Sequence, residues 1–138
     1  MRVALDTDVI VAALRSRTGA SNALVRALRR GRLDAVASVP MLLEYEAVLM
    51  RTEQRRAIGF TAAQVQQFLD GLAALLIPVT PYFLWRPMLR DPDDEMVLDA
   101  AVNGQADTIV TFNRRDFLPG ATQFQLSVLT PAQTLRRL

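Results

Sequence analysis

The stretch RVALDTDVIVAAL, residues 2–14, carries the first clear signal of a fold, since a short apolar run leads into two acids and then into a second apolar run. The first run is typical of a buried strand that ends at Asp6. By periodicity alone the second run fits either a strand or a helix. We expect a helix, because strands longer than about ten residues are uncommon and because Asp6, Thr7 and Asp8 form a natural helix start.

The rest of the chain repeats this alternation of short apolar runs with amphipathic segments. We expect extended segments at residues 33–38, 77–81, 106–112 and the first part of 124–138, and helices at 21–31, 39–51, 61–76, 91–104 and the end of the chain. Strands that alternate with helices predict a three-layer α/β/α fold, in which a central, mainly parallel sheet has helices on both faces. At 138 residues we expect one domain, residues 1–138.

Three residue types are absent from the sequence, which contains no Cys, no His and no Lys, so that all 16 basic side chains are Arg. These absences exclude a thiolate nucleophile, an imidazole base, a zinc site of the usual nitrogen or sulfur kind, a disulfide and a lysine Schiff base. Any catalysis must therefore use carboxylates, hydroxyls and Arg. Clustered carboxylates select hard cations such as Mg²⁺ or Mn²⁺.

From charge and hydropathy we expect a cytoplasmic protein that is not associated with a membrane. No apolar run approaches the roughly 18 to 20 residues that span a bilayer, and the first run contains an acid, unlike a secretory signal. The net charge is only +2, but seven arginines form two groups, which predict either phosphate-binding patches or solvated helix faces. These groups are Arg26, Arg29, Arg30 and Arg32, and Arg51, Arg55 and Arg56.

Two acids are expected at the crevice beyond the carboxyl ends of the strands, where open α/β sheets bind ligands. Asp6 ends the first strand, although it also suits a simple helix cap. In the helix of residues 39–51, Glu44 shares a stripe with Met41 and Val48, whereas Glu46 should face solvent. A carboxylate on a buried face is costly unless it is paired or bound to a metal. An Arg partner is therefore the alternative explanation for Glu44.

The stretch RDPDDEMVLDA, residues 90–100, crowds acids at the start of a helix, where the helix dipole favours negative charge. Asp94 lies on one stripe with the apolar positions 97, 98 and 101, so we expect it to point inward. Glu95 and Asp99 pair at i and i+4 on the other side, and we expect both to be solvated. Asp94 is therefore a third candidate site residue.

The stretch TIVTFNRRDF, residues 108–117, predicts a strand that runs into a polar turn. Thr111, Asn113 and Asp116 lie at or just past the end of this strand. They are either a fourth part of the site or ordinary turn residues, and the sequence leaves both readings open.

These residues together make the chain similar to PIN-domain proteins, in particular to the toxins of the VapC type in toxin and antitoxin pairs. The resemblance covers nearly the whole length, and its motifs are ALDTDVIVAAL (4–14), PMLLEYEAVLMR (40–51), RDPDDEMVLDAAVNGQADTIVTFNRRDF (90–117) and VLTPAQTL (128–135).

The resemblance implies a metal-dependent ribonuclease in which acids hold Mg²⁺ or Mn²⁺. Carried over by position, Asp6, Glu44 and Asp94 are the first three acids, both catalytic and metal-binding. The fourth position, often an acid in the family, is Asn113 here. Either Asp116 replaces the missing acid in catalysis or the neutral amide of Asn113 serves as a weaker metal ligand.

The resemblance also implies a substrate and partners. Thr111, Arg114 and Arg115 are expected to bind the RNA substrate, and the alternative for the two arginines is that they only solvate the turn. Asp8 adds a carboxylate where the family commonly has Asn. Related toxins pair with a small antitoxin whose tail occupies the acidic site, and they are often homodimers.

Two other functions compete with this interpretation. A haloacid-dehalogenase-like phosphatase also has an apolar strand before Asp-x-Asp, but it needs a Gly-Thr where this chain has Val9 and Ile10, and it needs a Lys. Alternatively, with Asn113 in place of an acid, the chain is a PIN-fold module that binds RNA or an antitoxin with little turnover.

Overall fold

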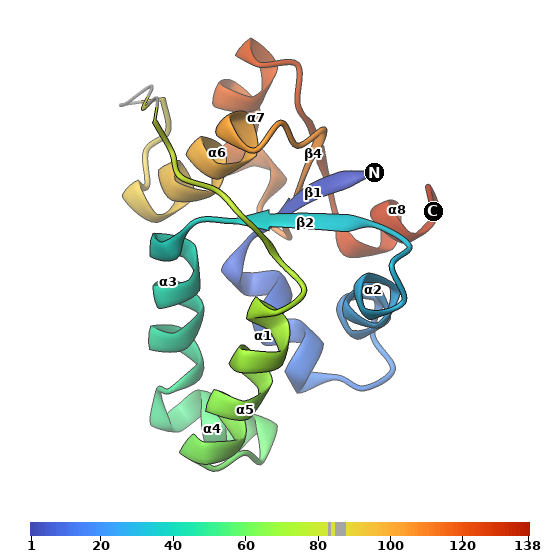
Figure 1. Cartoon of the computed structure of the whole chain (residues 1–138), viewed down its shortest axis with the longest axis vertical. Helices are drawn as coiled ribbons and strands as arrows, with labels where there is room; N and C mark the ends of the chain where they lie inside the picture. The colour runs from blue at the N-terminus through green and yellow to red at the C-terminus, as the bar shows by residue number, and fades with distance from the viewer. Residues whose placement is uncertain (83, 85–87) are drawn as a thin grey trace.

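The centre of the molecule is a five-stranded sheet in the order β3-β2-β1-β4-β5, shown in a computed structural model that describes residues 1–82, 84 and 88–138 (Figure 1). All four strand pairs are parallel, which confirms the predicted parallel sheet. The strands are β1 (Arg2–Leu5), β2 (Asp34–Ala37), β3 (Ile77–Pro78), β4 (Thr108–Val110) and β5 (Ser127–Leu129).

Helices cover both faces of this sheet, as the alternation of elements predicted. Figure 1 shows α6 and α7 on one side of the strands and α1, α2 and α3 on the other, with α4 and α5 farther from the sheet. In the described part of the chain, no helix is both long and apolar enough to cross a membrane. The helices are α1 (Thr7–Arg15), α2 (Ala20–Arg29), α3 (Val39–Leu49), α4 (Thr52–Ile58), α5 (Ala62–Ala73), α6 (Pro92–Asn103), α7 (Arg114–Gln123) and α8 (Pro131–Leu135).

The strand order reverses between β1 and β4. From β1 the chain first builds β2 and β3 on one side, and it then returns to place β4 and β5 on the other side. In the register of this pair, Leu5 lies opposite Val110, so the next residues, Asp6 and Thr111, emerge side by side. Such a switch point is where open α/β sheets have their ligand crevice.

The core explains why α3 lies beside this point. Tyr45 is almost completely buried, and its hydroxyl donates a hydrogen bond to the carbonyl of Leu5, the last residue of β1. Met41, Val48 and Leu49 pack on the same side of α3. A buried tyrosine hydroxyl needs such a partner, and the bond fixes α3 against the carboxyl end of the sheet.

Two helices were not predicted. Residues 113–116, expected as a polar turn, begin α7, which continues through Pro119. Packing holds this helix, since Phe117 is fully buried and Gly120 is so close to α6 that a Cβ atom there would lie 2.7 Å from Leu98. The other helix, α4, has no buried residue and therefore no apolar periodicity to predict it.

Candidate active site

Asp6 is the first polar residue after β1, and it is only 9% exposed. Its Oδ1 accepts a hydrogen bond from the Thr7 amide (2.8 Å) as the N-cap of α1, and its Oδ2 accepts one from the Thr111 hydroxyl (2.8 Å). Burial raises the pKa of Asp6, against the effect of these hydrogen bonds. The predicted position at the end of the first strand is confirmed.

Asp8 ties the β1–α1 junction to the β4–α7 junction. Its Oδ2 accepts hydrogen bonds from the Phe112 amide (3.1 Å) and from the Asn113 side-chain amide (3.2 Å). Its Oδ1 is buried and has no hydrogen-bond partner among the described residues. Burial, followed by the charge of Asp6, raises the pKa of Asp8 to about 7. The sequence pointed to Asp8 only as an additional acid.

Thr111 is fully buried, and its hydroxyl oxygen also accepts a hydrogen bond from the Asn113 amide (2.9 Å). Because Thr111 has no exposed surface in this conformation, its expected contact with substrate stays a prediction. Its hydroxyl donates to Asp6, the acid at the end of the neighbouring strand. Thr111 therefore orients an acid of the site.

Asp94 lies in the first turn of α6 and is half-buried. Burial, followed by the charges of Asp6, Asp91 and Asp116, raises the pKa of Asp94 to about 7. A shift from these neighbours requires that the start of α6 faces the end of β1 and the start of α7. Asp94 is thus directed toward the other acids, as predicted.

Glu95 and Asp99 were expected to be solvated, and that prediction is wrong. Glu95 is only 3% exposed and Asp99 only 2%. The segment before α6 covers Glu95, since the amides of Met88 (2.7 Å) and Leu89 (2.8 Å) both donate to Glu95 Oε1. The second oxygen, Oε2, is buried without a hydrogen-bond partner among the described residues.

Glu44 is half-buried at the edge of α3 and does not share the buried stripe. Tyr45 takes the inward position instead, which shifts the stripe by one residue, and Glu46 is half-buried where solvent exposure was expected. Burial raises the pKa of Glu44, the nearby Asp93 raises it further, and Arg51 lowers it. Glu44 therefore borders the acidic site, and the charge of Arg51 only partly offsets the rise of its pKa.

Two hollows flank these acids. The α6–α7 pocket, of about 560 Å³, is lined by Met88, Leu89, Arg90, Asp91, Asp94, Arg115, Asp116 and Pro119. The α1–α3 groove, of about 450 Å³, is lined by Thr7, Asp8, Val11, Ala12, Arg15, Glu44, Val48, Arg51, Gln54, Asp93 and Phe112. The acids thus lie between two open spaces.

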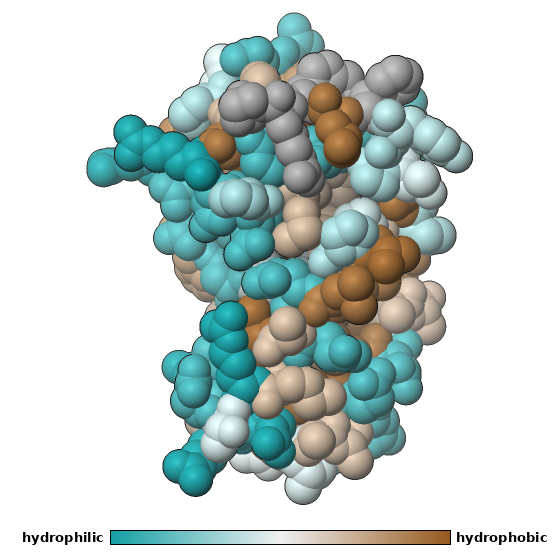
Figure 2. Space-filling model, turned by 90° about the vertical axis from the view of Figure 1, so that its left-hand side faces the viewer, coloured by the Kyte–Doolittle hydropathy of each residue, from teal (hydrophilic) through white to brown (hydrophobic). Residues whose placement is uncertain are grey.

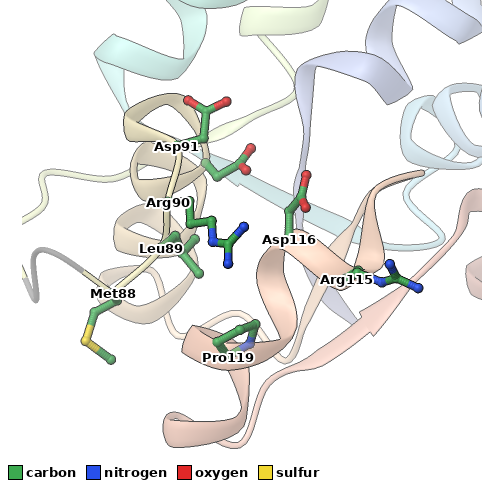
Figure 3. A pocket seen from close by; sticks show the side chains of 8 residues that line it. Met88, Leu89, Arg90, Asp91, Arg115, Asp116 and Pro119 are labelled. Carbon is green, nitrogen blue, oxygen red and sulfur yellow. The ribbon is translucent and has the colours of Figure 1, made fainter.

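The basic residues at the pocket point in different directions. In Figure 3, Asp116 and the guanidinium of Arg90 extend into the space between α6 and α7, whereas Arg115 extends away from it. Arg114 donates through Nε to the carbonyl of Val128 in β5 (2.8 Å). Arg90, which the sequence did not single out, therefore directs its charge into the pocket, whereas Arg115, which also lines it, points away. Its place just before the acidic helix start was the available signal.

The acids suit a hard divalent cation in their chemistry. The donors are oxygens, and Asp8 Oδ1 is buried without a hydrogen-bond partner among the described residues. Burial and then the charges of neighbouring acids raise the pKa values of Asp8 and Asp94, and a bound cation would relieve that repulsion. Within residues 1–82, 84 and 88–138, however, no three acids are arranged to hold one metal ion in this conformation. The donor set fits a metal, and metal binding requires the side chains to move closer together.

The parallel sheet and the acids at its carboxyl end define an α/β domain with a cluster of acids at the switch point, where open sheets of this kind bind ligands. The chain belongs to the PIN domain family, because the family model for the PIN domain matches residues 2–115. No curated protein shows significant similarity to the sequence.

Solved structures share this fold at low sequence identity. A chain of VapBC2 from Rickettsia felis, bound to a DNA fragment from its promoter, has a TM-score of 0.64 at 17% identity and covers 93% of this chain and 97% of its own. VapBC-1 from nontypeable Haemophilus influenzae has a TM-score of 0.64 at 16% identity, and the match covers 96% of this chain and 99% of the other. FitAcB from Neisseria gonorrhoeae has a TM-score of 0.57 at 19% identity, and the match covers 94% of this chain and 98% of the other. At these identities the likeness shows the fold alone.

Proposed function

We propose that this PIN domain is a metal-dependent endoribonuclease that hydrolyses RNA phosphodiesters as the toxin of a toxin and antitoxin pair. The observation that carries the proposal is the convergence of acids from separate elements at the β1–β4 switch point. Asp6, Asp8, Asp94 and Asp116 come from the β1–α1 junction, α6 and α7, and Glu44 borders them from α3. Repulsive carboxylates are gathered in this way where a cation is to be bound.

The acids have distinct roles in this proposal. Asp6, Glu44 and Asp94 would hold Mg²⁺ or Mn²⁺, with the side-chain oxygen of Asn113 as a neutral fourth ligand. When bound, the ion supplies a water of lowered pKa and offsets charge that develops on the phosphate. Thr111 holds Asp6 in its orientation through the 2.8 Å hydrogen bond.

Asp116 is the acid to which we assign direct proton transfer with the substrate or the attacking water. It is exposed in the first turn of α7 and directed into the α6–α7 pocket (Figure 3). A carboxylate there can accept a proton from an attacking water or from a ribose hydroxyl. We therefore propose that Asp116 supplies the acid that is missing at position 113.

The proposed partners follow from the fold and the surface. Structural neighbours are chains of VapBC and FitAB complexes, which supports a small antitoxin as partner. Figure 2 shows a band of apolar surface on the side of the molecule where α3 lies, and Val39 and Leu43 of α3 are strongly exposed. We propose that this face forms a homodimer, that residues 1–138 act as one domain, and that the protein acts in the cytoplasm.

A binding module with little turnover is the second candidate. It is favoured by Asn113, whose amide donates to Asp8 and adds no charge, and by the separation of the acids in this conformation. Both candidates share the fold and the partners, so an assay of turnover separates them.

The test is cleavage of end-labelled single-stranded RNA by the purified protein in Mn²⁺, Mg²⁺ or EDTA. We expect cleavage only with metal, and a loss of more than about 100-fold in Asp94→Asn, because even residues that only support metal ligands contribute about 10- to 100-fold. Asp34→Asn, an exposed acid at the start of β2, is the matched control and should keep full activity. Equal activity in wild type and Asp94→Asn indicates a contaminating nuclease and defeats the proposal, whereas no cleavage with intact RNA binding supports the binding module.

A further inference from the structure

The α1–α3 groove changes from acidic to basic along its length. On α1, Asp8, Val11 and Arg15 follow one another at helical spacing. Glu44, Val48 and Arg51 repeat the same order along α3 and just past its end. Seven residues of helix rise about 10 Å. The backbone positions of the two arginines therefore lie about 10 Å along the groove from those of the acids, and the Arg51 side chain reaches back far enough to lower the pKa of Glu44.

The arginines are placed for an anion. Arg15 donates through Nε to Gln54 Oε1 (3.0 Å), which orients its guanidinium. Arg51 has its charge near Glu44, at the border of the acidic site. The guanidinium is suited to phosphate because it presents paired donors in a plane. The acidic end of the groove would repel a polyanion without these cations.

Phe112 adds a flat apolar surface to the same groove. It follows β4 and is 51% exposed, although its amide is fixed by a 3.1 Å hydrogen bond to Asp8 Oδ2. This bond holds the backbone of Phe112 beside one of the acids while the ring remains in solvent. An exposed aromatic ring beside cations is the combination that binds single-stranded nucleic acid, because every unpaired base has a face that stacks.

We propose that the α1–α3 groove binds the single-stranded segment of RNA next to the cleaved phosphodiester, with Phe112 stacking on an unpaired base and Arg15 and Arg51 contacting the phosphate backbone. This inference rests on the proposed ribonuclease function and names the form of RNA that it takes. A duplex has its bases stacked on each other, so it cannot use Phe112.

The experiment measures RNA binding separately from cleavage. Fluorescence anisotropy of a labelled single-stranded RNA and of its duplex is recorded with the full-length Asp94→Asn protein, alone and combined with Phe112→Ala, Phe112→Trp or Arg51→Gln. Phe112→Ala should weaken single-strand binding by about 10-fold and leave duplex binding unchanged, whereas Phe112→Trp should retain the affinity. Arg51→Gln should reduce the salt slope of binding by about one for both RNAs.

The control variants are Leu118→Ala and Arg136→Gln, an exposed apolar residue and an exposed arginine outside the groove, and both should bind like the parent. Unchanged single-strand affinity in Phe112→Ala and an unchanged salt slope in Arg51→Gln overturn the inference and leave the groove to another occupant, such as the antitoxin. Absence of cleavage by wild type instead counts against the proposed function, because these binding results do not depend on turnover.

Discussion

Asp94 and Glu95 are neighbours in the first turn of α6, yet their surroundings are opposite. Asp94 is half-buried at the α6–α7 pocket, where burial and then repulsion by Asp6 and other acids raise its pKa. Glu95 is 3% exposed, and two backbone amides donate to one of its oxygens. The cost of burying the carboxyl group is thus offset at one oxygen of Glu95, although its Oε2 has no partner among the described residues, whereas Asp94 faces other acids.

The comparison shows how one helix start supplies both structure and a site. An acid with fixed donors stabilises the fold and holds the segment that carries Arg90, one of the pocket's lining residues. An acid left to face other acids gains most from a cation that the folded chain does not itself provide. Substitutions at these positions should therefore affect different properties, stability at one and metal-dependent activity at the other.

The largest effect on stability is expected for Glu95→Ala. It removes the acceptor of two buried amides, Met88 and Leu89, and should lower the free energy of unfolding by about 3 kcal/mol. Glu95→Gln keeps one oxygen and should cost about 1 kcal/mol. Urea unfolding followed by circular dichroism measures both.

The control for this prediction is Asp93→Ala, in the same turn but exposed, which should change stability by only a few tenths of a kcal/mol. If Glu95→Ala were as stable as Asp93→Ala, the two amides would find other acceptors. Glu95 would then not stabilise the fold, and its contrast with Asp94 would fail.

A smaller effect is expected for the N-cap of the same helix. Asp91 accepts a hydrogen bond from the Asp93 amide (2.9 Å), so Asp91→Ala should lower the free energy of unfolding by about 1 kcal/mol. Asp91→Ser preserves a capping oxygen and should restore most of the loss in the same urea experiment. Equal losses in both variants would show that Asp91 acts through its charge and not as a cap.

The sequence predicted the parts of this site that depend on local order. A strand that ends in an acid placed Asp6 correctly, and the helix start at residue 91 was evident from Pro92 and the acids around it. The parallel sheet followed from the alternation of elements. The helical spacing of Asp94 from the apolar positions of α6 correctly predicted that its side chain faces the other acids.

What could not be predicted depends on contacts between distant residues. Asp8 is held by Phe112 and Asn113, more than 100 positions away. The burial of Glu95 depends on a preceding segment that folds back over α6 and leaves no periodic signal. The stripe on α3 was misread by one residue because Tyr45, which has a polar end, takes the buried position that its hydrogen bond to Leu5 makes possible.

The smallest effect, and the one that tests the other half of the comparison, concerns the stability of metal-free Asp94→Asn. The substitution removes a charge that neighbouring acids repel, so at pH 8 in EDTA the variant should unfold about 1 to 3 °C above wild type. This figure is small because Asp94 is partly exposed to screening water. Differential scanning fluorimetry at pH 5 and pH 8 measures the difference.

The sign of the pH dependence follows from the direction of the shift. The pKa of Asp94 is about 7 in the folded protein against 3.8 in the unfolded chain, so between these values the folded state binds more protons. Wild type therefore loses stability as pH rises from about 4 to 7, and the advantage of Asp94→Asn should shrink at pH 5. Asp8, whose pKa is also about 7, leaves the variant a weaker pH dependence of stability with the same sign.

Mn²⁺ at pH 8 should stabilise wild type more than the variant, because an ion that binds only the folded state raises its stability. A variant that unfolds below wild type at pH 8 would mean that Asp94, like Glu95, makes compensating contacts.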